Sequence, residues 1–414
     1  MKILHISSYD IYGGASRAAF RLHTGMRAIG IDSQMLVMNK RGGDAYVLGN
    51  DKNSGKIIAK MRQICDRIPL FFYKKRVHLP FSLNWLPGDI SREINKLSPD
   101  ITVFHWINDG FVNLKTLKKL QMPAVIMPHD SWFFTGGCHI HLECSGFKKN
   151  CGHCPQLGSR YVYDISRCIF NKKMKIFSGL KNIYTVTASD FMNDCLRHSP
   201  VFSRFKGQVI PNGLDISVFK PAEKKICRSI LNLPADMKII LFGALNAQSD
   251  YNKGYDLLLD ALKKIKINKK LMLCVFGASE PLYNPFPYPC RYFGQVHEDY
   301  TLTLLYNAAD VMVVPSRQEG FGQTASEALA CGTPAAAFNS TGLKDIIDHR
   351  QNGYLAAPFS TEDLAFGIKW LLENKQPLFL AKKARAKAEK EFSHITQAGR
   401  YMEFFKNILS SAGN

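Results

Sequence analysis

The chain has 414 residues, 46% of them apolar, and a formal net charge of +20 at pH 7. This length exceeds what one hydrophobic core usually serves, so we expect two domains. No apolar run reaches the roughly 18 residues that a membrane-spanning helix needs, and the first run is too short for a signal peptide. These features disfavour an integral membrane protein, and the eleven cysteines of an unexported chain are expected to stay reduced.

Positive charge is concentrated in the first half of the chain. Residues 1–205 carry an excess of 15 basic over acidic side chains, and residues 206–414 an excess of 5. We expect no nucleic-acid partner, because no RNA-binding signature or zinc-finger spacing accompanies the charge. An anionic membrane surface would explain the bias equally well.

Residues 56–76 are the segment best suited to such a surface. Apolar residues recur there at helical spacing beside Lys and Arg, and an aromatic pair, Phe71 and Phe72, precedes three cations at positions 74–76. This pattern is typical of an interfacial segment. A helix packed on its own domain with a solvated basic edge is the alternative.

The N-terminus predicts the opening of a Rossmann-like unit. Residues 2–7 form an apolar run, Gly13 and Gly14 a turn, and residues 17–30 have helical periodicity. No Gly-x-Gly-x-x-Gly motif follows the strand, which disfavours a nicotinamide cofactor. An ordinary strand-to-helix turn is the alternative to a ligand-binding glycine loop.

Residues 100–106 and 124–130 predict two more buried strands, each with a histidine near its end. Ligands of open parallel sheets bind at the carboxyl ends of the strands. His129, which Asp130 follows, is therefore a candidate ligand-binding residue, although a lone histidine at a strand end is more often structural.

A cysteine-rich loop over residues 136–156 follows these strands. It holds three histidines and four cysteines, namely Cys138, Cys144, Cys151 and Cys154. The last two have the Cys-x-x-Cys spacing of zinc ligands, and the first two could complete a tetrahedral site that staples the loop. A reduced, metal-free cluster and a redox pair are the alternatives.

The middle of the chain contains the predicted border between the first and the second Rossmann-like unit. Residues 181–189 and 207–213 predict the last two strands of the first unit, and residues 238–243 the first strand of the next. An amphipathic helix follows over residues 255–262. Lys253 stands just before this helix, where it can neutralise an anionic ligand or simply cap the helix.

Residues 311–330 combine an apolar run, a glycine-bearing turn and a helix-forming run. Glu319 and Glu327 lie eight positions apart, and Gly320 and Gly322 leave the backbone between them unobstructed. The start of a helix attracts phosphate, whereas carboxylates accept hydrogen bonds from sugar hydroxyls. The combination predicts a ligand that is part phosphate and part sugar, although two solvated glutamates beside a turn would show the same spacing.

Several motifs in one order resemble the retaining glycosyltransferase family 4. They are Phe293-Gly-Gln-Val, Leu305–Asp310, the strand with Pro315-Ser316, Glu319-Gly-Phe-Gly, and earlier Ile210–Asp215 with Phe219 and Pro221, Lys253-Gly254 and Gly13-Gly14. The resemblance covers nearly the whole chain. It implies an α/β fold of the GT-B type, in which two Rossmann-like domains face each other across a cleft. We expect an acceptor-side domain over residues 1–205, a donor-binding domain over residues 206–385, and a helix over residues 386–414 that crosses back to the first domain.

The resemblance also implies roles for the matching residues. Lys253 would neutralise the leaving diphosphate, Glu319 would bind sugar hydroxyls near the reacting carbon, and Glu327 the ribose. His129 would orient a sugar hydroxyl, so the expected catalytic residues are His129, Lys253 and Glu319. The expected donor site comprises Gly13, Gly14, Lys253, Glu319, Gly320, Phe321, Gly322, Gln323 and Glu327. Many relatives have an arginine where this chain has Ala244, so one phosphate cation is missing or comes from elsewhere.

The expected activity follows from this resemblance. No Asp-x-Asp occurs in the chain, so we expect metal-independent catalysis without a cofactor, with charge neutralised by Lys253 and the helix start after Gly322. We expect a retaining hexosyltransferase-like enzyme that moves a sugar from a nucleotide-sugar donor to a lipid-linked oligosaccharide of a surface polysaccharide, such as a lipopolysaccharide O-antigen. Its place would be the cytoplasmic face of the membrane, as a peripheral protein. A nucleotide-sugar epimerase with the same fold and a non-catalytic sugar-nucleotide-binding protein are the alternatives.

Overall fold

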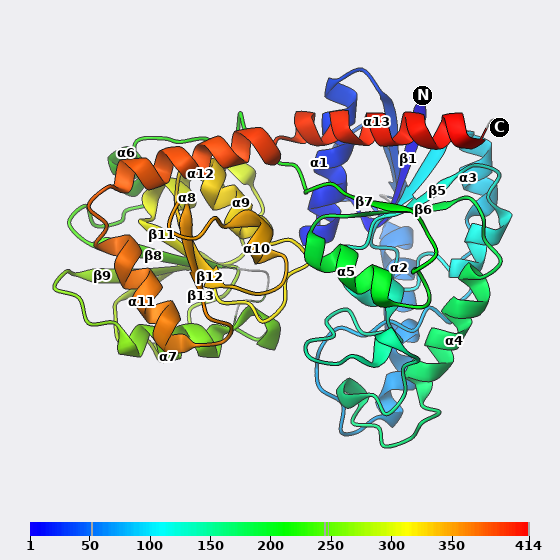
Figure 1. The fold of residues 1–414 in the computed structure, drawn as a ribbon, viewed down its shortest axis with the longest axis horizontal. Helices are drawn as coiled ribbons and strands as arrows, with labels where there is room; N and C mark the ends of the chain where they lie inside the picture. The colour runs from blue at the N-terminus through cyan, green and yellow to red at the C-terminus, as the bar shows by residue number, and fades with distance from the viewer. Residues whose placement is uncertain (51–52, 244–245, 247, 413–414) are drawn as a thin grey trace. The chain divides into compact units, whose positions relative to one another are not determined.

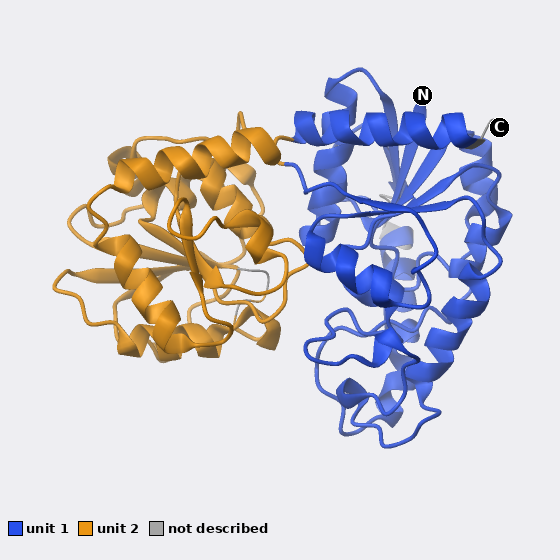
Figure 2. Cartoon of the chain, viewed as in Figure 1, with its two compact units in different colours: residues 1–213, 394–414 blue, residues 214–393 orange. Residues whose placement is uncertain are grey.

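The computed structural model describes residues 1–50, 53–243, 246 and 248–412. It divides into two compact units, coloured separately in Figure 2. Unit 1 comprises Met1–Gly213 and His394–Asn414, and unit 2 comprises Leu214–Ser393. Among the described residues, no helix combines the length and the apolar content needed to cross a membrane.

Unit 1 is built on a seven-stranded parallel sheet with the strand order β3-β2-β1-β4-β5-β6-β7. Its strands are β1 (Lys2–Tyr9), β2 (Asp32–Asn39), β3 (Val47–Asn50), β4 (Ile101–Phe104), β5 (Ala124–Ile126), β6 (Ile183–Thr187) and β7 (Gly207–Val209). Its helices are α1 (Gly14–Ala28), α2 (Asn53–Arg67), α3 (Ser91–Leu97), α4 (Ile165–Phe177), α5 (Asp190–His198) and α13 (His394–Ala412). Figure 1 shows α1 and α13 together beside the sheet.

Alternation along β1 divides the core of unit 1 into two layers. Leu4 and Ile6 belong to the cluster that includes Trp132, whereas Ile3 belongs to the cluster that includes Tyr401 of α13. Successive side chains of a strand point to opposite faces, so a central strand whose residues are buried from Ile3 to Ser8 is covered on both sides. The sheet is therefore buried between layers of helix, and its edge at the strand ends is left for ligands.

Unit 2 repeats the plan with a six-stranded parallel sheet in the order β10-β9-β8-β11-β12-β13. The strands are β8 (Lys238–Gly243), β9 (Leu271–Phe276), β10 (Cys290–Tyr292), β11 (Val311–Val314), β12 (Ala335–Phe338) and β13 (Gly353–Ala356). The helices are α6 (Lys224–Ile230), α7 (Tyr255–Lys264), α8 (Asp299–Ala308), α9 (Gln323–Ala330), α10 (Leu343–Ile346), α11 (Thr361–Leu372) and α12 (Pro377–Glu391). The predicted α/β class with two Rossmann-like units is confirmed.

The borders between the units differ from the sequence prediction. The first border lies after Gly213 rather than after residue 205, because β7 pairs with β6 and completes the first sheet. The second border lies between Ser393 and His394, and it divides the segment expected as one helix over residues 386–414. The end of α12 belongs to unit 2, whereas α13 packs on α1 in unit 1.

Candidate functional site

The carboxyl edge of the second sheet brings Lys253 and Glu319 together. Lys253 ends the short turn Tyr251–Lys253, and Gly254 follows with a φ of 68°. A Cβ on Gly254 would run into the carbonyl oxygen of Pro315, so glycine lets this turn lie directly on the chain that leaves β11. Asn252 fixes the contact: its Nδ2 donates to the Gln318 carbonyl at 2.7 Å, and its Oδ1 accepts from the Gln318 N–H at 3.0 Å.

The Lys253 ammonium lies 2.8 Å from Oε1 of Glu319, and both side chains are half-buried. Burial lowers the pKa of Lys253, but the neighbouring Glu319 carboxylate outweighs it and holds the pKa above its usual value. Two groups to which the resemblance assigns the diphosphate and the sugar therefore neutralise each other. A phosphate would compete with Glu319 for the ammonium.

Glu327 lies one helical turn into α9 and is 3% exposed. Its Oε2 accepts a hydrogen bond of 2.7 Å from the hydroxyl of Tyr306, a fully buried residue of α8. A charged group held by a buried hydroxyl keeps one orientation, which suits it to receive hydroxyl groups of a ligand. Sequence analysis assigned no role to Tyr306, because its contact with Glu327 joins two separate helices.

The residues between the two glutamates form the entry to α9. Gly322 precedes the helix with a φ of 111°, and a Cβ there would meet Leu343 at 2.7 Å. Gln323 is the first residue of α9, and Gly320 lies in the loop that precedes it. Phe321, by contrast, is buried against Phe392 with ring centroids 5.6 Å apart, so it supports the loop by packing.

Gly13 and Gly14 lie where β1 passes into α1. Gly14 is the first residue of the helix, and Gly13 precedes it with a φ of 83°. Apart from its neighbours in the chain and the backbone of α1, no atom of the described residues lies within 4 Å of where a Cβ of Gly13 would be. The backbone conformation, and not crowding, therefore calls for glycine here, and the space beside the loop is open.

His129 ends a chain of three imidazoles at the carboxyl edge of the first sheet. His105 Nδ1 lies 3.0 Å from His129 Nε2, and His105 Nε2 lies 3.0 Å from Nδ1 of His5. Burial lowers the pKa of His129 to about 4, against an opposing effect of Asp130. A ring with this pKa is neutral at pH 7 and a weak base, so it is suited to hydrogen bonding and unsuited to taking a proton. His5 has no signal in the sequence, because only the pairing of β1 with β4 brings it to this row.

The four cysteines predicted as zinc ligands gather in the cysteine-rich loop. Cys138, Cys144, Cys151 and Cys154 line one cavity of about 20 Å³ together with His141. Within the described ranges, however, no three His, Cys, Asp or Glu side chains are placed to hold a metal ion. Burial raises the pKa of Cys151 to about 12 and also raises those of Cys138 and Cys154, and all three side chains pack in hydrophobic clusters. Structural zinc stays a prediction for elemental analysis.

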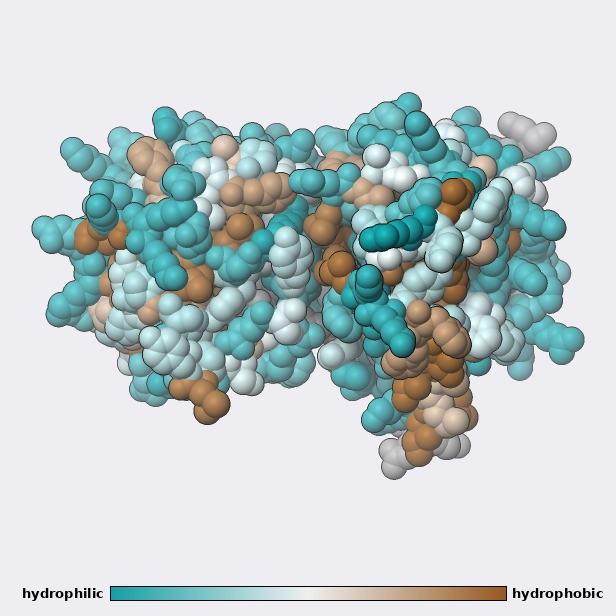
Figure 3. Space-filling view, turned by 90° about the horizontal axis from the view of Figure 1, so that it is seen from below, coloured by the Kyte–Doolittle hydropathy of each residue, from teal (hydrophilic) through white to brown (hydrophobic). Residues whose placement is uncertain are grey.

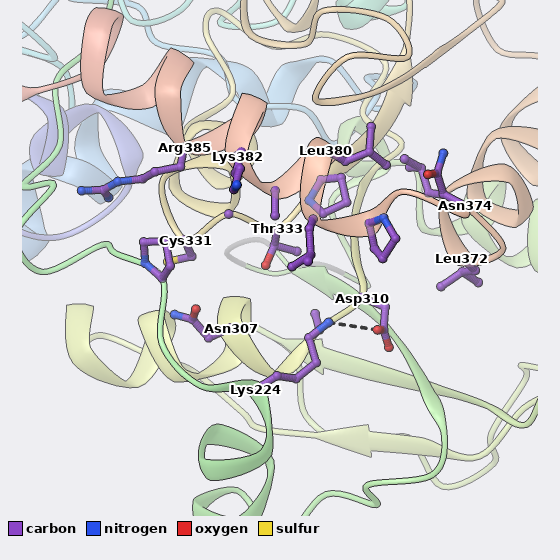
Figure 4. Close-up of a pocket in the computed structure, with 18 of the residues that line it drawn as sticks. Lys224, Asn307, Asp310, Cys331, Thr333, Leu372, Asn374, Leu380, Lys382 and Arg385 are labelled. Atoms are coloured by element: carbon purple, nitrogen blue, oxygen red, sulfur yellow. Dashed lines mark hydrogen bonds and ion pairs between the residues drawn. The ribbon is translucent and has the colours of Figure 1, made fainter.

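A cavity of about 540 Å³ in unit 2, drawn in Figure 4, lies at the opposite edge of the sheet from Lys253. Its lining includes Lys238 at the start of β8 and Asp310 directly before β11. Lys224 lies 2.9 Å from Asp310, and Arg228 lies 2.8 Å from it. This carboxylate ties α6 to the sheet, so we assign the cavity a structural role. Ala244, the position where relatives have an arginine, lies outside the described residues.

Comparison with known proteins bears on the site. Residues 224–391 match the family described as glycosyl transferases group 1. The uncharacterized glycosyltransferase MJ1607 of Methanocaldococcus jannaschii is 34% identical over 261 residues, which cover 57% of this chain and 65% of that protein. The chain spans less than two thirds of the length of the curated relatives that it matches.

Solved structures with a similar fold cover nearly the full chain. Sucrose-phosphate synthase of Thermosynechococcus elongatus has a TM-score of 0.68 at 19% identity and covers 99% of this chain and 100% of its own. Alr3699/HepE of Anabaena, whose crystal structure contains UDP and glucose, has a TM-score of 0.61 at 18% identity, with 98% and 100% covered. At these identities the likeness shows the fold alone.

Proposed function

We propose that the protein is a retaining glycosyltransferase with a nucleotide-sugar donor. The proposal starts from two findings: residues 224–391 belong to the glycosyl transferases group 1, and the chain has the α/β GT-B fold. The observation that carries the proposal is the meeting of Lys253 with Glu319 at the entry to α9, beside the buried Glu327. A cation and a helix start suit a diphosphate, and two carboxylates suit the hydroxyls of a sugar and a ribose. The UDP and glucose in the similar Anabaena structure support the same class of donor.

Each of these groups has a task in the transfer. Departure of the nucleoside diphosphate builds negative charge on its phosphate oxygens, which the Lys253 ammonium and the N-terminus of α9 stabilise. Glu319, released from Lys253 by the phosphate, accepts hydrogen bonds from sugar hydroxyls, and Glu327 holds the ribose. A phosphate oxygen on the departing face takes the proton of the acceptor, which leads to retention. Neutral His129 donates or accepts one hydrogen bond and takes no proton.

We further propose that the acceptor is lipid-linked and that the protein reaches it as a peripheral protein at an anionic membrane. Ile57, Ile58, Met61 and Ile64 of α2 are each more than half exposed. The same helix packs inward with polar residues: Arg62 Nε donates to the Gly110 carbonyl at 2.8 Å, and Gln63 Nε2 donates to Asp109 at 3.0 Å. A helix that turns its apolar side outward is the reverse of the packed, solvated helix considered as the alternative.

The apolar surface continues beyond α2. The short helix η1 (Ile68–Phe72) follows directly, and its Phe71 and Phe72 are 74% and 85% exposed. Figure 3 shows the brown patch that this part of unit 1 forms among teal neighbours. Lys74, Lys75 and Arg76 stand next in the chain, so apolar and cationic groups share one surface, as in interfacial helices. Surface-polysaccharide synthesis is the process in which such an acceptor is elongated.

A single set of incubations tests the proposed activity. The protein is mixed with a panel of nucleotide sugars, with and without a lipid-linked oligosaccharide, and the products are separated. We expect transfer of one sugar to the lipid-linked acceptor with the anomeric configuration retained. Isomerisation of a donor without acceptor would instead identify an epimerase, and binding without turnover would identify a non-catalytic sugar-nucleotide-binding protein.

A further inference from the structure

Unit 1 contains a second basic feature, a cavity of about 700 Å³ between α2 and the carboxyl ends of β1 and β2. This volume falls in the roughly 300–1,000 Å³ range of small-ligand sites. The lining residues are Tyr9, Asn39, Lys40, Arg41, Gly42, Lys56, Ala59, Lys60 and Gln63. Four of them are cations and none is an acid.

The nearby carboxylates are already occupied. Asp10 accepts backbone N–H groups of Ile11, Arg41 and Gly42 at 2.7 to 3.1 Å, which orders the loop after β2. Asp109 accepts the hydroxyl of Tyr9 at 2.9 Å and the amide of Gln63 at 3.0 Å. In the described part of the chain, the ammonium groups of Lys40, Lys56 and Lys60 have no hydrogen-bond or ion-pair partner. The cavity therefore presents unpaired positive charge.

One helix joins this cavity to the apolar surface. The lining residues of α2 are Lys56, Ala59, Lys60 and Gln63, spaced i, i+3, i+4 and i+7, which is one helical face. Ile57, Met61 and Ile64 directly follow Lys56, Lys60 and Gln63 in the chain and so occupy the adjoining face, where they are exposed. An anion-binding face and an apolar face thus lie side by side along α2.

We infer that the cavity binds the phosphate or diphosphate of a lipid-linked acceptor, while the exposed face of α2 contacts the lipid chain at the membrane surface. A lipid phosphate is one of the few ligands that carry an anion directly attached to an apolar chain, which matches the two adjoining faces. This inference rests on the proposed function, because the lipid-linked acceptor that it names is the substrate that the proposed enzyme elongates.

Binding of farnesyl diphosphate to the full chain tests the site without any sugar transfer. The triple variant Lys40→Ser, Lys56→Ser and Lys60→Ser should lose at least about tenfold in affinity by calorimetry, because each removes a charge-assisted contact. The matched control removes three exposed lysines of the same unit elsewhere, as Lys96→Ser, Lys118→Ser and Lys181→Ser. We expect the control to bind within about twofold of wild type, since exposed charges beyond a Debye length are screened. Equal losses in both triples, or none in either, would overturn the site.

Binding of inorganic diphosphate distinguishes a site for a lipid-linked phosphate from a site for free phosphate. We expect it to bind at least about tenfold more weakly than farnesyl diphosphate, because it lacks the chain that buries apolar surface of α2. The pair Ile57→Ser and Met61→Ser should weaken farnesyl diphosphate alone. Equal affinity for the two probes would reduce the cavity to a plain anion site and overturn the lipid assignment. Sugar transfer with normal donor use but no binding of farnesyl diphosphate would overturn this inference alone, whereas binding without any transfer would overturn the proposed function alone.

Discussion

The ammonium of Lys253 lies 2.8 Å from Oε1 of Glu319, although 66 residues separate them in the chain. Both groups are half-buried, and each is the other's counter-ion. A bound diphosphate would take over the ammonium and leave Glu319 to accept hydroxyl hydrogen bonds. Under the proposed function, donor binding would therefore also free Glu319.

Lys253→Ala is expected to lower kcat more than it weakens donor binding. The charge on the leaving diphosphate grows towards the transition state, so the ammonium stabilises that state more than the bound donor. Loss of such a preorganised group costs about 10²- to 10³-fold in kcat. Steady-state kinetics and donor titrations measure the two effects, and Lys263→Ala on the exposed side of α7 is the control. Losses of the same size in both quantities would indicate uniform binding.

Glu327→Ala is expected to weaken nucleotide-donor binding by an order of magnitude or more. Each ribose hydroxyl bonded to a charged group contributes about 1.5 to 3 kcal/mol. Tyr306→Phe removes only the hydrogen bond that orients Glu327, so we expect a smaller loss of about 1 kcal/mol, near fivefold. Calorimetry with UDP and with nucleotide sugars measures both, and donor affinity unchanged by Glu327→Ala would remove this residue from the site.

Acid pH is expected to destabilise unit 1 through its buried histidines. Burial holds the pKa of folded His129 at about 4, below the value of about 6.5 in an unfolded chain. The unfolded state therefore binds the proton first, and stability that is complete above about pH 6.5 falls as the pH drops towards 4. Between pH 7 and pH 5 this single group contributes a loss of about 2 kcal/mol in the free energy of unfolding.

Urea unfolding of the wild type and of His129→Gln at pH 7, 6 and 5 measures this contribution. The variant should show a shallower fall of the unfolding free energy over the same range, with the remaining slope coming from His5, His105, His23 and His141, whose pKa values burial also lowers. Identical slopes for the two proteins would show that His129 is not held neutral by the fold.

Vesicles containing anionic lipid are expected to retain the protein at low salt and to release most of it as salt rises. Each cation near an anionic surface contributes about 1 kcal/mol, and salt screens this over about 10 Å at 0.1 M. Changing Lys74, Lys75 and Arg76 to Ser should lower retention without unfolding, and Phe71→Ser with Phe72→Ser should remove a salt-resistant remainder. Co-sedimentation in which neutral and anionic vesicles bind equally would contradict the electrostatic part, and binding to neither would contradict the membrane surface altogether.

The local strand, turn and helix units could be predicted from the sequence alone. Residues 311–330 were predicted as strand, glycine turn and helix because those patterns are contiguous, and β11 and α9 lie where they were expected, with Glu319 in the turn and Glu327 one helical turn into α9. The same holds for Gly13 and Gly14 between β1 and α1. Apolar periodicity and turn-forming residues are patterns that span a few residues, so they can be recognised in a single sequence.

Which residues from distant parts of the chain meet could not be predicted from the sequence and follows from the fold. Lys253 reaches Glu319 because β8 and β11 pair side by side, and His5, His105 and His129 form one row because β1, β4 and β5 are neighbours in the sheet. The helical spacing over residues 56–76 predicted an amphipathic helix but not which of its sides packs inward. The contacts of Arg62 and Gln63 show that the polar side packs inward and the apolar side faces out. Strand order and the facing of a helix depend on long-range packing, which local sequence patterns do not encode.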